Sequence, residues 1–98
     1  MTPIIQREDG ESKGRYMATY EDLPGEIAEM TYSKVGVSQI IIDHTDAPNS
    51  MRGRGAGRAL VEAAVKDARA IGVKIIPLCP FAKAMFEKSP EWSDVLRR

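Results

Sequence analysis

Three features of this 98-residue sequence carry residue types that could do chemistry. The run Arg52-Gly53-Arg54-Gly55-Ala56-Gly57 combines three glycines with two arginines, His44 is the only histidine, and Cys79 is the only cysteine. Glycines let a backbone turn sharply and approach a ligand closely, and the first amides of a following helix point outward without a helical partner. The run therefore predicts an anion-binding turn, and phosphate is the anion that such turns most often hold.

The spacing within this glycine turn argues against the common nucleotide-binding loops. A P-loop needs Gly-Lys-Ser/Thr, whereas Gly57 is followed by Arg58 and Ala59. A dinucleotide fingerprint needs a third glycine where its two possible registers place Arg58 or Leu60. ATP, GTP, NAD and FAD are therefore disfavoured. An RNA-binding role is disfavoured too, because Arg-Gly-Arg-Gly occurs once and without interleaved aromatic residues.

The residues before the glycine turn have the two-residue period of strands. Ile4 and Ile5 begin one predicted strand, and alternation of apolar and polar residues predicts two more at residues 16–20 and 28–33. Residues 37–43 include an isoleucine triplet, which predicts a central strand buried on both faces. The first half of the chain is therefore expected to form a β-meander.

The residues after the glycine turn change to a helical period. Apolar residues recur at helical spacing over residues 58–71, and Gly72 is placed to end that helix. Residues 73–78 then predict a strand, which lies parallel to the central strand if the connection is a right-handed crossover. Pro80 suits the first turn of a second helix over residues 80–88. The glycine turn, His44 and Cys79 would then meet at the carboxyl ends of two neighbouring strands, where open α/β sheets bind ligands.

Length and composition predict one domain, residues 1–98, in the cytoplasm. A lone cysteine cannot form an internal disulfide, and the chain has neither an apolar N-terminal signal nor a stretch of ~20 apolar residues. The net charge is zero but uneven: residues 1–49 carry four Lys or Arg against nine Asp or Glu, and residues 50–98 carry ten against five. The basic half suits a ligand with several phosphates and the acidic half a cationic amine, although ordinary solvated faces explain the counts equally well.

The glycine turn also matches a wider family pattern. Arg52, Gly55 and Gly57 satisfy Arg/Gln-x-x-Gly-x-Gly/Ala, which resembles the acyl-CoA pyrophosphate motif of the GNAT superfamily of N-acetyltransferases. Together with His44-Thr45 and the Pro-Leu-Cys-Pro-Phe segment at 77–81, the second half is similar to the minimal, single-domain YjdJ-type N-acetyltransferase-like family. The first half is similar only in its strand pattern. The resemblance implies an α/β (α+β) fold with a mixed, mostly antiparallel sheet: a β-meander followed by a β-α-β-α unit.

The same resemblance implies acetyl-CoA as the cofactor and assigns residues to it. Backbone amides from the glycine turn would hold the pyrophosphate while its arginines add charge, and the backbone after His44 would follow the pantetheine arm. The implied cofactor-binding residues are Thr45, Asp46, Ala47, Arg52, Gly53, Arg54, Gly55, Ala56, Gly57 and Arg58.

Acetyl transfer to an amine needs a base, a stabilised oxyanion and a proton for the departing thiolate. His44 is the candidate base, because an imidazole can accept a proton near neutral pH. Backbone amides beyond the isoleucine triplet could polarise the thioester carbonyl. Cys79 precedes a helix start, which favours a thiolate, so it could be a nucleophile or a general acid. Simple packing of Cys79 and a capping role for His44 remain open alternatives.

The chain departs from larger GNAT enzymes in two ways. Their usual general acid is a tyrosine after the second conserved strand, but all three tyrosines here precede the glycine turn. The helical pair that normally follows the first strand is missing, which implies an open acceptor site suited to a protein lysine or a polyamine. The sequence predicts an acetyl-CoA-dependent N-acetyltransferase, with a non-catalytic CoA-binding module or a purely structural domain as alternatives. No metal, nucleic acid or membrane is expected to bind.

Overall fold

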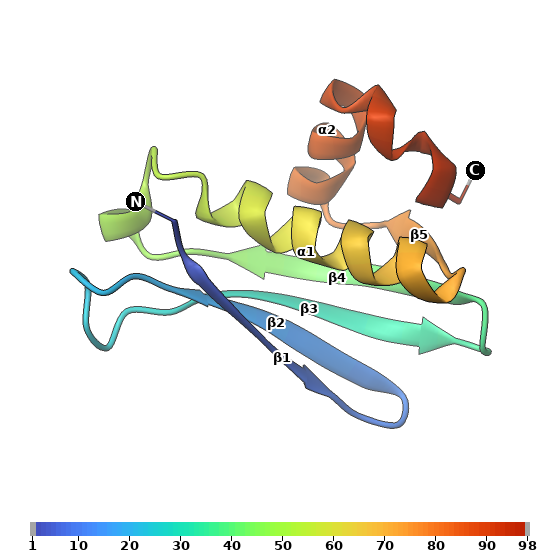
Figure 1. Cartoon of the computed structure of the whole chain (residues 1–98), viewed down its shortest axis with the longest axis horizontal. Coiled ribbons are helices and arrows are strands. Elements are labelled where there is room, and N and C mark those ends of the chain that lie inside the picture. Colours follow the sequence, from blue (N-terminus) through green and yellow to red (C-terminus); the bar gives the residue numbers. More distant parts are fainter. Residues whose placement is uncertain (1, 98) are drawn as a thin grey trace.

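The computed structural model of the chain describes residues 2–97 and places helices beside one twisted sheet (Figure 1). The strands are β1 (Ile4–Asp9), β2 (Lys13–Thr19), β3 (Ala28–Val35), β4 (Gln39–Asp46) and β5 (Lys74–Pro77). The helices are α1 (Ala56–Ile71) and α2 (Pro80–Lys88), with short 3-10 helices η1 (Asn49–Met51) and η2 (Pro90–Val95). Among the described residues, no helix is long and apolar enough to cross a bilayer.

The sheet has the order β1-β2-β3-β4-β5, so each strand pairs with its neighbour in sequence. The first four strands are antiparallel and form the meander, whereas β5 lies parallel to β4. A parallel neighbour needs a long crossover connection, and α1 supplies it. The predicted fold class is therefore confirmed: a mixed, mostly antiparallel sheet with a meander followed by a β-α-β-α unit.

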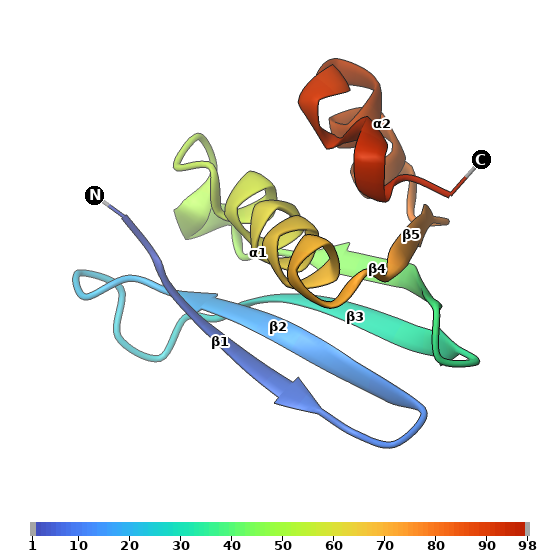
Figure 2. The same ribbon diagram turned by 45° about the vertical axis from the view of Figure 1, so that its right-hand side comes forward.

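The helices cover only part of the sheet. α1 crosses one face of β1–β4, and α2 with η2 packs beside α1 at the β5 edge (Figure 2). Tyr16, Ala18, Met30 and Tyr32 point toward α1 and are buried, whereas their neighbours along the strands are more exposed. The opposite face of β1–β3 carries no helix from the described part of the chain (Figure 2).

The central strand differs from its prediction in position and burial. β4 covers Gln39–Asp46 instead of residues 37–43, because Gly36 and Val37 form the turn after β3, where Gly36 has a φ of 62° and Val37 is 98% exposed. Burial on both faces was also wrong. Ile40 and Ile42 are buried on the face that the helices cover. Ile41, between them, points to the opposite face and is only half-buried, because no helix covers that face.

The main helix begins slightly earlier than its period predicts. α1 starts at Ala56 instead of Arg58, directly after Gly55, and ends before Gly72, whose φ of 75° closes it as predicted. β5 is shorter than the predicted 73–78 strand. The helix buries one continuous stripe against the sheet, made of Ala56, Leu60, Val61, Ala64, Val65 and Ala68.

The C-terminal segment closes the core on the side of β5. Trp92 and Val95 of η2 are buried, and the Trp92 ring meets Phe86 of α2 edge-on, with centroids 5.5 Å apart. Leu96 forms a parallel bridge with Ile75 of β5. The sequence pattern gave no prediction for this segment, because 3-10 turns lack the long periodicity that identifies helices.

Candidate active site

β4 and β5 separate at their carboxyl ends and leave a gap there. Their pairing runs from Gln39 opposite Lys74 to Ile42 opposite Pro77. The Cys79 amide then donates a hydrogen bond to the Ile42 carbonyl at 3.1 Å, which marks the last contact between the two strands. β4 continues to Asp46 beside β3 while the chain after β5 turns into α2. The end of β4 and the start of α2 therefore form two walls of a wedge.

A β-bulge sets the direction of the side chains at the end of β4. Thr31 pairs with His44 and Tyr32 pairs with Ile42, so Asp43 is an extra residue in β4. Paired residues in a sheet share a face, so His44 lies with Thr31 on the face without helices. Its side chain is exposed.

Thr45 follows His44 and therefore lies on the opposite face of the sheet, opposite the buried Met30. There it meets Cys79, whose Sγ donates to Thr45 Oγ1 at 3.6 Å. The structure thus brings Cys79 together with Thr45, while it places His44 on the other face.

The Cys79 thiol is buried, being only 5% exposed, and it immediately precedes α2. Burial by itself would raise the pKa of the thiol. A thiolate has no proton to donate, so in that form the sulfur accepts hydrogen bonds from the backbone of Ala82, from the Thr45 hydroxyl and from the backbone of Phe81. These bonds together outweigh the effect of burial, so the pKa of the thiol lies below the ordinary value. A cysteine at a helix N-terminus is a recognised setting for a reactive thiolate.

The glycine turn presents the start of α1. Gly53 and Gly55 have φ angles of 80° and 79°, which a residue with a side chain rarely adopts. The first helical hydrogen bond runs from Ala59 to the Gly55 carbonyl at 2.9 Å. The amides of residues 56–58 precede that bond, so they point out of the helix end, where its dipole favours an anion.

Two other amides of the turn are already used. The Arg52 amide donates to Asn49 at 3.0 Å, and the Arg54 amide donates to Met51 at 3.1 Å. These bonds continue η1 into the turn and fix its shape. The amides at the helix start are therefore better placed for a ligand than those of the two arginines.

The three arginine side chains of the turn have different surroundings. Arg54 makes two hydrogen bonds to the Asp22 carboxylate, at 2.9 and 2.8 Å. Arg58 lies over the Trp92 ring, 4.9 Å from its centroid. The Arg52 side chain is exposed and makes no hydrogen bond or ion pair with any described residue. Of the three predicted charges, that of Arg52 is the most available to a ligand.

A cavity of about 570 Å³ joins the wedge to the glycine turn. Asp46 and Arg54 are the two predicted cofactor-binding residues that do not line it. Sequence reasoning missed five lining residues, of which Phe81 and Met85 lie four residues apart on α2 and so share one face of that helix. The lining consists of Thr45, Ala47, Pro48, Asn49, Met51, Arg52, Gly53, Gly55, Ala56, Gly57, Arg58, Phe81 and Met85.

The Phe81 ring lies directly against Gly57 of α1. A Cβ atom at Gly57 would lie 2.5 Å from the Phe81 ring, which is closer than carbon atoms can approach. Gly57 therefore lets α2 come close to the start of α1, and the aromatic ring forms part of the cavity wall.

Comparison with known proteins agrees with this arrangement. A profile of the family described as GCN5-related N-acetyl-transferase matches residues 15–95. The chain belongs to this family. Its fold is similar to the NMR solution structure of a GCN5-like candidate N-acetyltransferase from Staphylococcus aureus, with a TM-score of 0.70 and 36% sequence identity over 94% of this chain and 87% of that one. The predicted GNAT resemblance is thereby confirmed. A search of curated proteins found no match.

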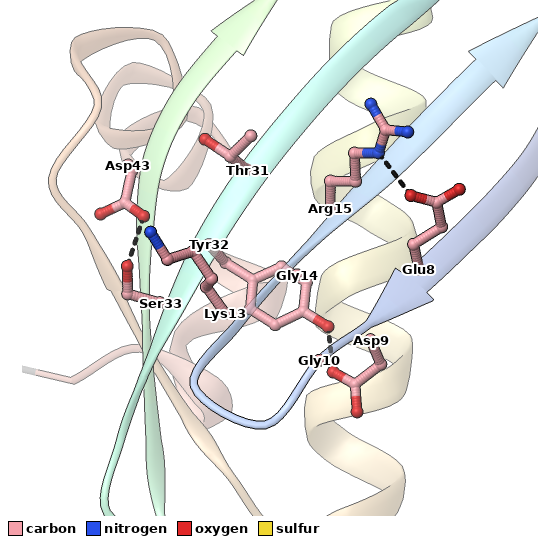
Figure 3. A pocket seen from close by; sticks show the side chains of 10 residues that line it. All are labelled: Glu8, Asp9, Gly10, Lys13, Gly14, Arg15, Thr31, Tyr32, Ser33 and Asp43. Carbon is pink, nitrogen blue, oxygen red and sulfur yellow. Dashed lines mark hydrogen bonds and ion pairs between the residues drawn. The ribbon is translucent and has the colours of Figure 1, made fainter.

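The uncovered face of this GNAT protein carries a second hollow, of about 590 Å³ (Figure 3). Asp43 lines it and accepts a hydrogen bond from Ser33 at 2.7 Å, while Arg15 donates to Glu8 at 2.7 Å. Thr31, the cross-strand partner of His44, also lines the hollow. This face is therefore polar, and its far end adjoins His44.

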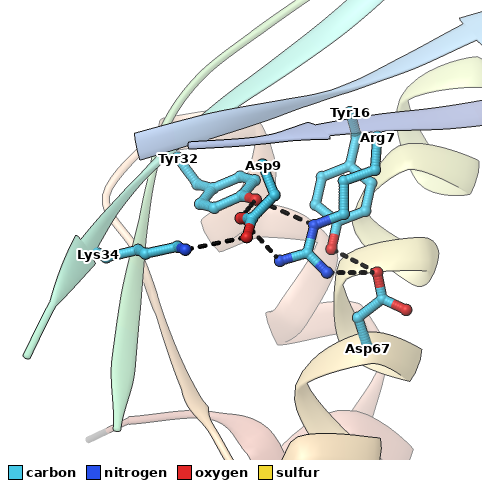
Figure 4. Close-up of polar contacts among 6 residues, drawn as sticks. All are labelled: Arg7, Asp9, Tyr16, Tyr32, Lys34 and Asp67. Atoms are coloured by element: carbon cyan, nitrogen blue, oxygen red, sulfur yellow. Dashed lines mark hydrogen bonds and ion pairs between the residues drawn. The ribbon is translucent and has the colours of Figure 1, made fainter. Parts of the chain in front are cut away.

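A polar cluster farther along the sheet links the GNAT core to its first strand (Figure 4). The Tyr16 hydroxyl donates to Asp67 of α1 at 2.7 Å, and Arg7 of β1 donates to Tyr32 at 3.0 Å. Burial raises the pKa of both tyrosines, and hydrogen bonds to Asp67 and Asp9 act in the same direction. None of these residues lines the cavity beside Cys79, so the cluster holds β1 against the core. Its six members are Arg7, Asp9, Tyr16, Tyr32, Lys34 and Asp67.

Within residues 2–97, no three His, Cys, Asp or Glu side chains are placed to share a metal ion.

Proposed function

We propose that this GNAT protein transfers an acetyl group from acetyl-CoA to a primary amine. One observation carries the proposal: a single cavity connects the free amides at the start of α1 with the wedge where Thr45 meets Cys79. That cavity offers an anion site at one end and Thr45 at the other. Cys79 does not line the cavity and lies directly behind Thr45, in contact with its hydroxyl. A cofactor with a pyrophosphate at one end and a thioester at the other matches both ends.

Different residues of the cavity would bind different parts of acetyl-CoA. The amides of residues 56–58, with the charge of Arg52, would bind the pyrophosphate. The edge of β4 at Thr45 and Ala47 would follow the pantetheine arm, since its backbone groups lie beyond the last contact with β5. The thioester would then lie in the wedge near Cys79. Acetyl-CoA supplies the activated acetyl group.

The bulge in β4 supplies a place for the carbonyl oxygen. Because Asp43 is an extra residue, the backbone between Ile42 and His44 departs from regular pairing with β3. An amide freed in this way could donate to the oxygen as negative charge develops on it, which lowers the barrier to attack at the carbonyl carbon.

The proton transfers can be assigned to His44 and Cys79. In direct transfer, the His44 imidazole takes a proton from the ammonium group, the amine nitrogen bonds to the acetyl carbon, and the carbon–sulfur bond breaks. The departing CoA thiolate takes the Cys79 proton, and the second proton of the amine nitrogen then passes to the Cys79 thiolate, which restores the thiol. In the two-step route, the Cys79 thiolate attacks the acetyl carbon and CoA leaves as a thiolate. The amine, neutralised by His44, then attacks the acetyl–Cys79 thioester and releases the Cys79 thiolate, and the second proton of its nitrogen passes to the CoA thiolate. The hydrogen bonds that lower the pKa of Cys79 favour the second route, because they stabilise the thiolate that attacks the acetyl group.

The acceptor would approach from the uncovered face of the sheet, where His44 lies. Asp43 and Asp46 flank His44 in the sequence and are exposed, and Glu29 pairs with Asp46 across the strands. Their negative charges attract an ammonium group. Because this face is open, a lysine side chain of another protein or a polyamine fits better than an acceptor that must be enclosed.

The second candidate function is a CoA-binding module without efficient catalysis. The observation in its favour is that His44 and Cys79 lie on different faces of β4, so the proposed base and thiol are not in contact. Both functions use the same cavity and differ only in whether the acetyl group leaves the cofactor.

An acetyl-transfer assay separates the two candidates. The purified protein is incubated with radiolabelled acetyl-CoA and either a lysine-containing peptide or spermidine. We expect labelled acceptor, with Cys79→Ala and His44→Ala each lowering the rate at least about a hundredfold. Unchanged rates in both variants would show that Cys79 and His44 do not take part in the acetyl transfer. Tight cofactor binding with no labelled acceptor would instead support the binding module.

A further inference from the structure

The loop between β2 and β3 contacts the glycine turn. Figure 1 shows this loop at the same end as η1. Two of its residues meet Arg54: the Tyr20 hydroxyl donates to the Arg54 carbonyl at 3.1 Å, and Asp22 accepts the two guanidinium bonds. The guanidinium also lies over the Tyr20 ring, 5.1 Å from its centroid. Arg54 is thus held at its carbonyl, at its two terminal guanidinium nitrogens and at its amide, which donates to Met51.

Arg54 occupies a sensitive position in the turn. It lies between Gly53 and Gly55, both of which have left-handed backbones. Glycines have the largest conformational freedom of any residue, so a turn with two of them has many alternative shapes in isolation. Fixing the residue between them restricts both. The orientation of the amides at the start of α1 then depends on how firmly Arg54 is held.

We propose that Tyr20 and Asp22 are positioning residues for cofactor binding, which clamp Arg54 and thereby hold the glycine turn in its anion-binding shape. This inference rests on the proposed binding of acetyl-CoA. It assigns Arg54 a role different from that of a phosphate ligand: its side chain faces the β2–β3 loop and does not line the cavity. A preorganised turn binds more tightly because less conformational freedom is lost on binding.

The two roles of Arg54 predict opposite results when Asp22 is removed. If Arg54 were a phosphate ligand restrained by Asp22, Asp22→Ala would release it toward the cofactor and tighten binding. If Asp22 clamps the turn, the same substitution loosens it and weakens binding. The hydrogen bond from Arg54 lowers the pKa of Asp22, so the carboxylate is charged and the pair is intact at neutral pH.

The chain offers a matched control. Arg69 makes the same two-bond contact with Asp94, at 2.7 and 2.8 Å, and neither residue lines the cavity. Asp94→Ala therefore removes an equivalent exposed ion pair elsewhere on the surface. Any general effect of losing such a pair on stability is common to both variants.

The test measures acetyl-CoA affinity by calorimetry in the wild type, Asp22→Ala, Tyr20→Phe and Asp94→Ala. We expect Kd to rise about threefold to tenfold for Asp22→Ala, to rise for Tyr20→Phe, and to stay unchanged for Asp94→Ala. Asp22→Ala combined with Arg54→Ala should bind like Arg54→Ala alone, because both substitutions remove one clamp. An unchanged or lower Kd for Asp22→Ala in a wild-type protein that binds would overturn the clamp.

A second measurement tests the clamp without any cofactor. Amide hydrogen exchange of Arg54, followed by NMR in the free protein, reports on its bond to Met51. The clamp predicts faster exchange at Arg54 in Asp22→Ala and no change in Asp94→Ala, and equal exchange in all three proteins would contradict it. If the wild type fails to bind acetyl-CoA, the proposed function is contradicted. The exchange result still decides whether Asp22 holds the turn at Arg54.

Discussion

Thr45 and Cys79 lie side by side across the gap between β4 and α2, with Oγ1 and Sγ 3.6 Å apart, although they are far apart in the sequence. The contact joins the end of a strand to the start of a helix. Hydrogen bonds to the thiolate from both elements lower the pKa of Cys79 despite its burial.

The first prediction concerns the ionisation of Cys79. Because the folded protein lowers the thiol pKa, alkylation by iodoacetamide should reach its half-maximal rate at a lower pH than the ~8.5 of a free cysteine. Thr45→Val removes the hydroxyl hydrogen bond and should move the midpoint to higher pH. Acetyl-CoA should slow alkylation by covering the thiol. A midpoint unaffected by Thr45→Val would show that the Thr45 hydroxyl does not lower the pKa of the thiol.

The second prediction compares two glycines of the turn. Gly55→Ala forces a side chain onto a φ of 79° and should lower the free energy of unfolding by about 1 kcal/mol. Gly57→Ala instead places a methyl group against the Phe81 ring. Substituting Phe81→Ala should therefore remove most of the cost of Gly57→Ala and none of the cost of Gly55→Ala. Urea denaturation of the five variants measures both differences, and equal rescue at the two positions would contradict the geometry.

The third prediction concerns the charge at the turn. Arg52 is the arginine without a partner in the described chain, so Arg52→Ala should raise the Kd for acetyl-CoA about tenfold. Binding by the variant should also depend less on salt, since one phosphate contact is lost. Arg69→Ala, which removes an arginine remote from the cavity, is the control. Equal losses in the two variants would mean that only net charge matters.

The fourth prediction concerns the polar cluster around Tyr16. Tyr16→Phe removes the hydroxyl that donates to Asp67 and should lower the free energy of unfolding by about 1 kcal/mol. The ring remains buried, and Asp67 keeps its contact with Arg7 at 3.2 Å. Urea denaturation measures the change, and acetyl-CoA affinity should stay that of the wild type. A large loss of affinity would tie this cluster to the cavity.

Much of the fold followed from local patterns in the sequence. Two-residue alternation identified β2 and β3, and helical spacing identified α1, because each element has one buried and one exposed face. The position and burial of β4 did not follow. An isoleucine triplet suits a strand covered on both sides, but which faces are covered depends on where α2 and η2 pack, and that is a tertiary property.

The part of the candidate site formed by the glycine turn could be predicted from the sequence, and the rest could not. The turn around Gly55 requires backbone angles that glycine adopts readily, so the spacing of the glycines predicts the turn. The bulge that puts His44 on the uncovered face and Thr45 on the helix face left no mark in the sequence, because it depends on the register with β3. The contact of Asp22 with Arg54 was equally hidden, since it joins residues from two distant loops.

The central claim is that the cavity between the glycine turn and Thr45 binds acetyl-CoA. Calorimetric titration of the purified protein with acetyl-CoA, using ATP and NADH as controls, tests it most directly. We expect saturable binding of acetyl-CoA, weakened by Arg52→Ala, and no comparable binding of the two controls. Absence of acetyl-CoA binding, or equal binding of all three nucleotides, would contradict it.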